Sequence, residues 1–204
     1  MRFSIIIPAH NAEQRIVPLL ESIEKQTFKD YELIVVCDAC TDGTDEVCSR
    51  YNARMFSVDA HNCAVARNKG LDEARGEYVL FADDDDHWIH PFALEQIDRE
   101  LNYSKDATAD MIQCAFVYGK HGVTPITGRI YPNVWSKIWK RSAIGLTRFP
   151  PDRFPADDLG FTLAMLDKGV TVGFATILWY YYEYPREGSI MWKQEHEGRS
   201  VLPD

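Results

Sequence analysis

Four consecutive aspartates, Asp83 to Asp86, directly follow the apolar run Tyr78 to Ala82. The apolar run predicts a short buried strand, so the carboxylates gather where that strand ends. Charges of one sign repel strongly at a few ångströms, and a bound divalent cation would neutralise such a cluster. A cation held there would keep coordination positions for a phosphate-bearing ligand. The alternative is a solvated acidic turn, which describes most runs of like charge.

The composition excludes some partners. The 204-residue chain has a formal net charge of −9, which argues against nucleic acid as the main partner. No stretch approaches the ~18 apolar residues that a membrane-spanning helix needs, and the apolar run near the N-terminus is too short for a signal peptide. We therefore expect a cytoplasmic protein without an integral membrane segment.

The cysteines predict free thiols. An odd number of them, without a signal peptide, is typical of a reducing compartment. One pair, Cys37 and Cys40, has the spacing of a zinc or redox site, but no second pair follows at zinc-finger distance. The five cysteines are Cys37, Cys40, Cys48, Cys63 and Cys114.

Apolar and helical patterns alternate in the first half of the chain. Apolar strands that are joined by helices predict an α/β fold, with a mostly parallel sheet covered by helices on both faces. Ligands bind such sheets beyond the carboxyl ends of the strands, where Pro8, Asp38 and Asp83 fall. Asn11 is expected to cap a further helix, which contains Pro18. The expected strands are 3–8, 31–37, 55–58 and 78–82, and the other expected helices are 44–51, 64–74 and 91–101.

The second half of the chain is less regular. It predicts a strand at 111–118, a Gly-, Pro- and Thr-rich loop or hairpin at 119–132, and a helix at 157–168. Two more strands are expected at 170–174 and 177–184. Because no repeat or linker divides the chain, we expect one domain over residues 1–204.

Recognisable segments extend along nearly the whole chain. They are Ser4 to Asn11, Gln26 to Val36, Asp38 with Thr41-Asp42-Gly43, Ala66-Arg67-Asn68, Gly76 to Phe81, the aspartate run, Trp135 to Arg141, Phe154 to Asp158, and Tyr180-Tyr181-Tyr182 with Gly188-Ser189-Ile190. In this order they resemble a family 2 glycosyltransferase of GT-A fold. The resemblance implies inverting transfer of a sugar from a nucleotide diphosphate donor to a hydroxyl of a glycan or lipid-linked saccharide. It says little about which sugar is moved.

The resemblance also implies a divalent metal, Mn²⁺ or Mg²⁺. The family's Asp-x-Asp motif falls on Asp83-Asp84-Asp85, so Asp83 and Asp85 would be the metal ligands and Asp84 would face the ribose or the metal. Both ions prefer carboxylate and phosphate oxygens. The register Asp84-x-Asp86 stays open, because the stretch from Asp86 to Pro91 is one residue longer than is usual in the family.

Further donor contacts follow from the same resemblance. Asp38 matches the position that accepts a hydrogen bond from the nucleobase, as expected for a UDP-sugar. An ordinary turn at a strand end is the alternative for Asp38, and a surface ion pair is the alternative for Arg67. The other implied contacts are Pro8, Ala9 and Asn11 along the base, Glu13 near the nucleotide, and Arg67 and Arg186 on the diphosphate, which guanidinium groups bind well.

The acidic pair Asp157-Asp158 matches the family's Glu-Asp pair, which makes Asp158 the implied general base. Inversion needs a carboxylate that takes the acceptor proton on the side opposite the leaving group. Both aspartates could instead cap the helix at 157–168. Trp135 and Trp192 are candidates for acceptor contacts. A lipid-linked acceptor would require transient membrane contact through exposed aromatic and basic residues such as Lys137, Lys140 and Arg141.

Two other functions fit parts of the pattern. A sugar nucleotidylyltransferase also uses a parallel sheet and metal-binding aspartates, but it places a Gly-rich loop after the first strand, where Pro8-Ala-His-Asn11 has no glycine. A protein could also bind a nucleotide sugar without turning it over. The filled metal and base positions favour the enzyme, with a nucleotide-sugar-binding half at about 1–115 and an acceptor-binding half at about 116–204.

Overall fold

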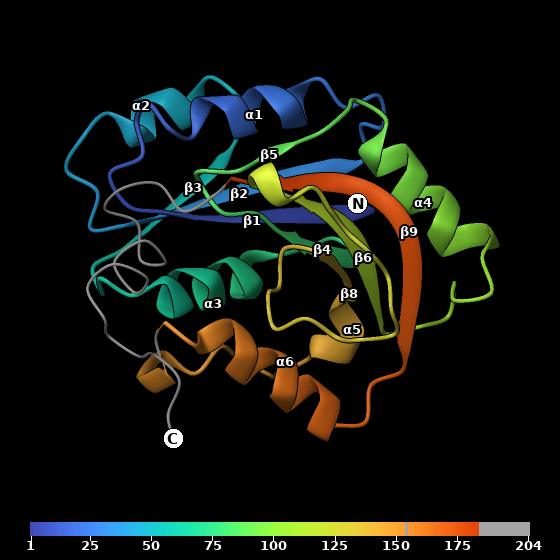
Figure 1. Cartoon of the computed structure of the whole chain (residues 1–204). Helices are drawn as coiled ribbons and strands as arrows, with labels where there is room; N and C mark the ends of the chain where they lie inside the picture. The colour runs from blue at the N-terminus through green and yellow to red at the C-terminus, as the bar shows by residue number, and fades with distance from the viewer. Residues whose placement is uncertain (154, 184–204) are drawn as a thin grey trace.

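A curved mixed β-sheet runs through the computed structural model, which describes residues 1–153 and 155–183 (Figure 1). The strand order is β3-β2-β1-β4-β8-β6-β9-β5, and β7 pairs with β6 outside this path. The first four strands are parallel, as expected for apolar strands that are joined by helices. They are β1 (Phe3–Ala9), β2 (Tyr31–Asp38), β3 (Arg54–Val58) and β4 (Tyr78–Phe81).

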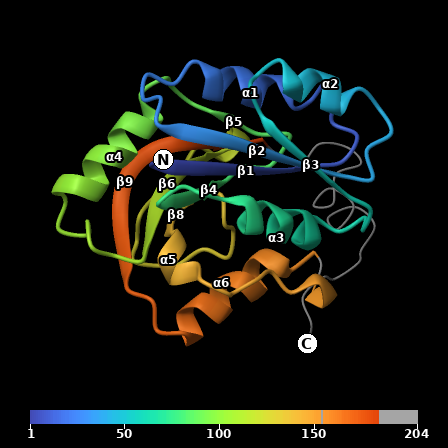
Figure 2. The ribbon, with the colours of Figure 1, turned by 180° about the vertical axis from the view of Figure 1, so that it is seen from behind.

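Alternate residues of the central strand β1 enter two different cores. Ile5 and Ile7 pack in a cluster with Leu19 and Leu20 of α1 (Val17–Glu24). Ile6 belongs to the cluster on the opposite face, together with Phe161 of α6 (Asp157–Asp167). The two views of the ribbon place α1 and α2 (Thr44–Ser49) on one face, and α3 (Cys63–Glu73) and α6 on the other (Figures 1 and 2). The predicted covering of both faces is therefore confirmed.

The second half of the chain extends the same sheet with mixed pairing. β8 (Lys137–Lys140) is antiparallel to both β4 and β6 (Met111–Tyr118). β9 (Val172–Tyr182) runs parallel to β6, and the short β5 (His87–Trp88) pairs antiparallel with its far end. We predicted two strands in place of β9. The structure has one long strand, whose pairing with β6 shifts register near Ala115. The remaining strand is β7 (Val123–Thr124).

One helix begins elsewhere than predicted. Asn11 does not cap a helix: α1 starts at Val17, and the Asn11 side chain instead accepts a hydrogen bond from the backbone N–H of Thr41. Pro18 is the second residue of α1, where the missing N–H costs nothing. Two further helices, α4 (Ala93–Tyr103) and α5 (Arg141–Ile144), complete the described α-helices. None of the helices in the described part of the chain is long and apolar enough to cross a membrane.

Candidate active site

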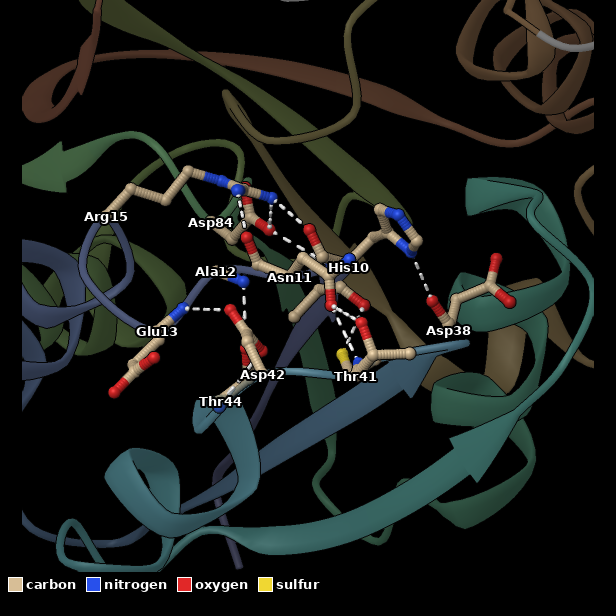
Figure 3. A network of polar contacts seen from close by, with 12 residues as sticks. His10, Asn11, Ala12, Glu13, Arg15, Asp38, Thr41, Asp42, Thr44 and Asp84 are labelled. Carbon is tan, nitrogen blue, oxygen red and sulfur yellow. Dashed lines mark hydrogen bonds and ion pairs between the residues drawn. The ribbon is translucent and has the colours of Figure 1, made fainter.

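Two loops are tied together at the carboxyl ends of β1 and β2 (Figure 3). The Thr41 N–H donates to Asn11 Oδ1 at 2.7 Å, and the Ala12 N–H donates to Thr44 Oγ1 at 2.8 Å. The Glu13 N–H donates to Asp42 Oδ2 at 3.1 Å, while the Glu13 carboxylate accepts from the Gly43 N–H at 3.4 Å. Asn11 and Glu13, both predicted near the nucleotide, thus fix the shape of this rim.

Asp38 lies at the end of β2 and is 4% exposed. Its carboxylate accepts backbone N–H groups from Ala60 at 2.8 Å and from His61 at 2.9 Å, as well as from Asn62. Carboxylate oxygens can accept more than one hydrogen bond each, so these contacts leave capacity for a further donor. The neighbouring Pro8 and Ala9 lie in β1, paired with Val36 and Cys37 of β2.

The acidic run is partly neutralised by the protein itself. Arg15 makes two contacts with Asp84, at 2.9 Å to Oδ1 and 2.8 Å to Oδ2 (Figure 3). Arg67 Nη2 lies 2.7 Å from Asp83 Oδ1. A bound cation is therefore not the sole neutralising charge at the run, because Arg15 and Arg67 already offset two of its four carboxylates.

Asp86 has a different environment from the other aspartates of the run. It is 1% exposed and accepts hydrogen bonds from the Tyr180 hydroxyl at 2.7 Å and the Glu183 N–H at 2.8 Å. Burial raises the pKa of Asp86 well above its usual range, and the negative charges of Asp83 and Asp85 add to the shift. Asp86 is therefore engaged with β9, whereas Asp83 and Asp85 are partly exposed.

Arg67 joins the acidic run to the start of α6. Its guanidinium lies 2.8 Å from Asp157 Oδ2 and 2.8 Å from Asp158 Oδ1, in addition to its contact with Asp83. Arg67 is 5% exposed, so the alternative of a surface ion pair is wrong. Burial alone would lower its pKa, but the carboxylates outweigh burial and raise the pKa well above the usual range.

Asp158 is held on two sides. Its Oδ2 accepts the Val134 N–H at 3.1 Å, and its Oδ1 faces Arg67. Burial raises the pKa of Asp158 to about 6, while the positive charge of Arg67 opposes the shift. The residue at the cap position of α6 is Ala156, and no side chain makes a capping hydrogen bond there. The alternative that Asp157 and Asp158 cap this helix is therefore not seen.

Two predicted surface contacts are wrong. Trp135 is 5% exposed and stacks between Tyr180 and Tyr182, with ring centroids 4.6 and 5.0 Å away, so it is a core residue. Lys137 is fully buried, and its ammonium donates to the carbonyls of Tyr131 and Asn133. Neither can touch an acceptor or a membrane surface in this conformation. Two other predicted contacts, Arg186 and Trp192, lie outside the described residues.

Sequence reasoning missed two residues of this site, Arg15 and Tyr180. Nothing in the local pattern around Arg15 points to Asp84, which is 69 positions away in the chain. For Tyr180, the spacing of the tyrosines in the sequence indicates which ring lies beside it. Alternate residues of a strand share one face, so Tyr180 and Tyr182 are expected to lie on the same side of β9, and both stack on Trp135.

The carboxylates of the acidic run suit a hard divalent cation, but they do not provide all of its ligands. In residues 1–153 and 155–183, no three His, Cys, Asp or Glu side chains converge to hold a metal. Asp83 and Asp85 offer carboxylate oxygens, which Mg²⁺ and Mn²⁺ prefer, and both ions commonly complete their coordination with phosphate oxygens and water. The cysteine pair at Cys37 and Cys40 is free and forms no disulfide.

Comparison with known proteins gives the family. The model of the family described as "Glycosyl transferase family 2" matches residues 4–166. The chain belongs to this family. It is 32% identical over 193 residues to a Bacillus subtilis protein assigned as TuaG, a glycosyltransferase of teichuronic acid biosynthesis, covering 82% of this chain and 73% of TuaG. Staphylococcus aureus TarS, a poly(ribitol-phosphate) β-N-acetylglucosaminyltransferase, is 27% identical over 215 residues, which cover 94% of this chain and 37% of TarS.

Solved structures confirm the predicted GT-A fold. Residues 1–349 of S. aureus TarS in complex with UDP-GlcNAc superpose with a TM-score of 0.81 at 24% identity, covering 94% of this chain and 60% of that one. The mannosyltransferase PcManGT of Pyrobaculum calidifontis, in complex with GDP-Man and Mn²⁺, has a TM-score of 0.72 at 21% identity, covering 94% and 59%. This chain spans only part of the length of several relatives. The matched segment covers 37% of the length of TarS and 15% of the length of Streptococcus pneumoniae GlyA.

Proposed function

We propose that this chain is an inverting glycosyltransferase domain that moves a sugar from a UDP-sugar to a hydroxyl of a glycan or lipid-linked saccharide. One observation carries the proposal: the Arg67 guanidinium contacts Asp83 of the acidic run at 2.7 Å and Asp158 at 2.8 Å. The proposed donor-binding carboxylates and the proposed base are therefore separated by a single side chain. Family membership, together with the names of TarS and TuaG, supports sugar transfer in polysaccharide synthesis.

Asp158 is the proposed general base. Its pKa of about 6 leaves most of it ionised at neutral pH, yet makes it a stronger base than an ordinary carboxylate. The Val134 N–H contacts Oδ2 and Arg67 contacts Oδ1, so the carboxylate has a fixed orientation. In the proposed reaction it meets an acceptor hydroxyl that approaches from the side opposite the leaving group. Arg67 keeps the carboxylate ionised, because its positive charge favours the deprotonated form.

Donor binding is proposed for the rim formed by β1, β2 and β4. Asp83 and Asp85 would hold Mn²⁺ or Mg²⁺, which when bound offsets the negative charge of the leaving nucleoside diphosphate. Asp38 would accept a hydrogen bond from the base, and Asp84 would face the ribose while Arg15 holds it in place. Residues about 1–115 form the proposed donor half and about 116–204 the acceptor half. Pro8, Ala9, Asn11, Glu13, Arg67 and Arg186 complete the proposed donor contacts.

Replacing the proposed base tests the function. The purified chain is incubated with Mn²⁺ and a panel of nucleotide sugars. Transfer is measured to saccharide acceptors and to water, which takes the sugar when no saccharide is bound. Asp158→Asn is expected to keep UDP binding in calorimetry and to lower the transfer rate by about 10²–10⁴-fold, the usual contribution of a general base. The matched control is Asp167→Asn, an exposed position near the other end of α6, which should transfer at the wild-type rate.

The outcomes separate the candidate functions. Normal transfer by Asp158→Asn would show that another group takes the proton. Tight UDP binding by the wild-type chain with no transfer to any acceptor or to water would favour a nucleotide-sugar-binding protein. The family match already argues against the sugar nucleotidylyltransferase alternative.

A further inference from the structure

The Tyr180 hydroxyl connects the two ends of the acidic run. It accepts the backbone N–H of Asp83 at 2.9 Å and donates to Asp86 Oδ2 at 2.7 Å. The other oxygen of Asp86 accepts the Glu183 N–H at 2.8 Å. A single hydroxyl on β9 therefore touches the first and the last aspartate of the run, although Tyr180 lies 97 positions from Asp83 in the chain.

The tyrosine ring itself is firmly placed. Tyr180 is 0% exposed, and its ring stacks on Trp135 at a centroid distance of 4.6 Å and an interplanar angle of 13°. Trp179 packs against it edge-on at 5.4 Å, and the Tyr180 backbone pairs with Trp88 of β5. Buried aromatic rings in such contacts have few alternative rotamers, so the hydroxyl is a fixed point on the rigid sheet.

The acidic run needs such a fixed point. The Asp86 N–H donates to the Asp83 carbonyl at 3.2 Å, so residues 83–86 form a tight turn with four carboxylates on it. Repulsion between these groups favours a wider and more mobile turn. The two hydrogen bonds to Tyr180 oppose that opening at both ends. They also direct Asp86 toward β9, away from the partly exposed Asp83 and Asp85.

We propose that Tyr180 is a positioning residue, which holds the turn 83–86 in the shape that presents Asp83 and Asp85 to a divalent cation. In this arrangement the fourth aspartate is the anchor of the turn rather than a ligand. The inference rests on the proposed function, because it assumes that the acidic run binds a metal. It assigns a role to a residue that would touch neither the metal nor the sugar.

The test removes one oxygen atom. In Tyr180→Phe the stacking ring remains, while the Asp83 N–H and the Asp86 carboxylate lose their shared partner. Groups that orient metal ligands from behind typically contribute 10–100-fold to metal affinity, so we expect Mn²⁺ binding in calorimetry to weaken at least about tenfold. UDP binding measured without metal should stay within about twofold of wild type. The matched control is Tyr182→Phe, which removes a hydroxyl from another ring stacked on Trp135 and should bind Mn²⁺ like the wild type.

Three results would overturn the inference. Unchanged Mn²⁺ affinity in Tyr180→Phe would remove the positioning role. Equal loss in Tyr182→Phe would mean that the two hydrogen bonds of the Tyr180 hydroxyl are not the cause, because Tyr182 makes neither of them. A wild-type structure with Mn²⁺ and UDP that shows the turn detached from Tyr180 would also reject it, even if the variant fails to fold. Failure of the proposed function has a different sign. If the wild-type chain itself binds UDP no better with Mn²⁺ than without it, the proposed metal role is wrong, and the role of Tyr180 fails with it.

Discussion

At the scale of single residues, four identical side chains in sequence have four different surroundings. Asp83 faces Arg67, Asp84 is paired with Arg15, and Asp86 is buried against Tyr180. Asp85 is partly exposed. The sequence located this cluster but could not assign these roles, because each partner comes from a distant segment. Environment, rather than residue type, distinguishes the four carboxylates.

This difference predicts the register of the metal site. Asp85→Asn should weaken Mn²⁺-dependent UDP binding at least about 100-fold, because a charged ligand is lost. Asp86→Asn should weaken it by about tenfold at most, since the amide can still accept a hydrogen bond from Tyr180 or Glu183. Calorimetry with and without Mn²⁺ measures both variants. A larger loss in Asp86→Asn than in Asp85→Asn would instead support Asp84-x-Asp86.

At the scale of the elements, the parallel strands were the most predictable part of the fold. β1, β2, β3 and β4 lie within one residue of the predicted bounds. For β1, β2 and β4 the reason is that strands buried on both faces read as continuous apolar runs. The failures occur where a distant partner decides the local structure. Asn11 has the residue type of a helix cap, yet it binds Thr41 in the next loop. The sequence predicted a break between two strands at 175–176. β9 is instead one strand, and its pairing with β6 shifts register near that point.

The packing of α3 on the sheet gives a prediction at this scale. A Cβ added at Gly70 would lie 2.4 Å from Cγ2 of Ile6, a residue buried in the centre of β1. Alanine favours a helix by about 1 kcal/mol over glycine, but overpacking a core costs about 1–3 kcal/mol or more. We therefore expect Gly70→Ala to lower the free energy of unfolding by up to about 2 kcal/mol in denaturant titrations.

Gly43→Ala is the matched control for this prediction. The added Cβ there would meet only the end of the flexible Glu13 side chain, at 2.8 Å, and that group can move aside. The free energy of unfolding should change by less than about 0.5 kcal/mol. Equal effects in the two variants would mean that the close approach of α3 to β1 does not limit the packing.

At the scale of the whole molecule, the strand order places a lysine in the middle of the sheet. β8 follows β6 in the chain but lies between β4 and β6 in space. Lys137 on β8 pairs with Gln113 of β6. Its side chain is buried against the segment that carries the Tyr131 and Asn133 carbonyls, so the prediction of a surface role is wrong. Hydrophobic patterning alone cannot reveal this, because the order of strands in the sheet differs from their order in the chain.

The burial of Lys137 predicts how stability depends on pH. Burial lowers the pKa of Lys137 to about 7, although the negative charge of Asp158 opposes the shift, whereas the unfolded chain keeps a value near 10.5. Between these values the unfolded state binds the extra proton, so the free energy of unfolding should rise with pH, by up to about 1.4 kcal/mol per pH unit. Below pH 7 both states are protonated and the contribution becomes constant.

Comparison with Lys137→Met isolates this effect from all other titrating groups. Denaturant titrations at pH 7, 8 and 9 should show the wild-type free energy of unfolding rising relative to the variant by about 1 kcal/mol per pH unit. Parallel pH profiles would mean that the carbonyls of Tyr131 and Asn133 stabilise the buried ammonium enough to keep its pKa near the unfolded value. In that case Lys137 would be a permanent positive charge close to Asp158, and it would join Arg67 in keeping the proposed base ionised.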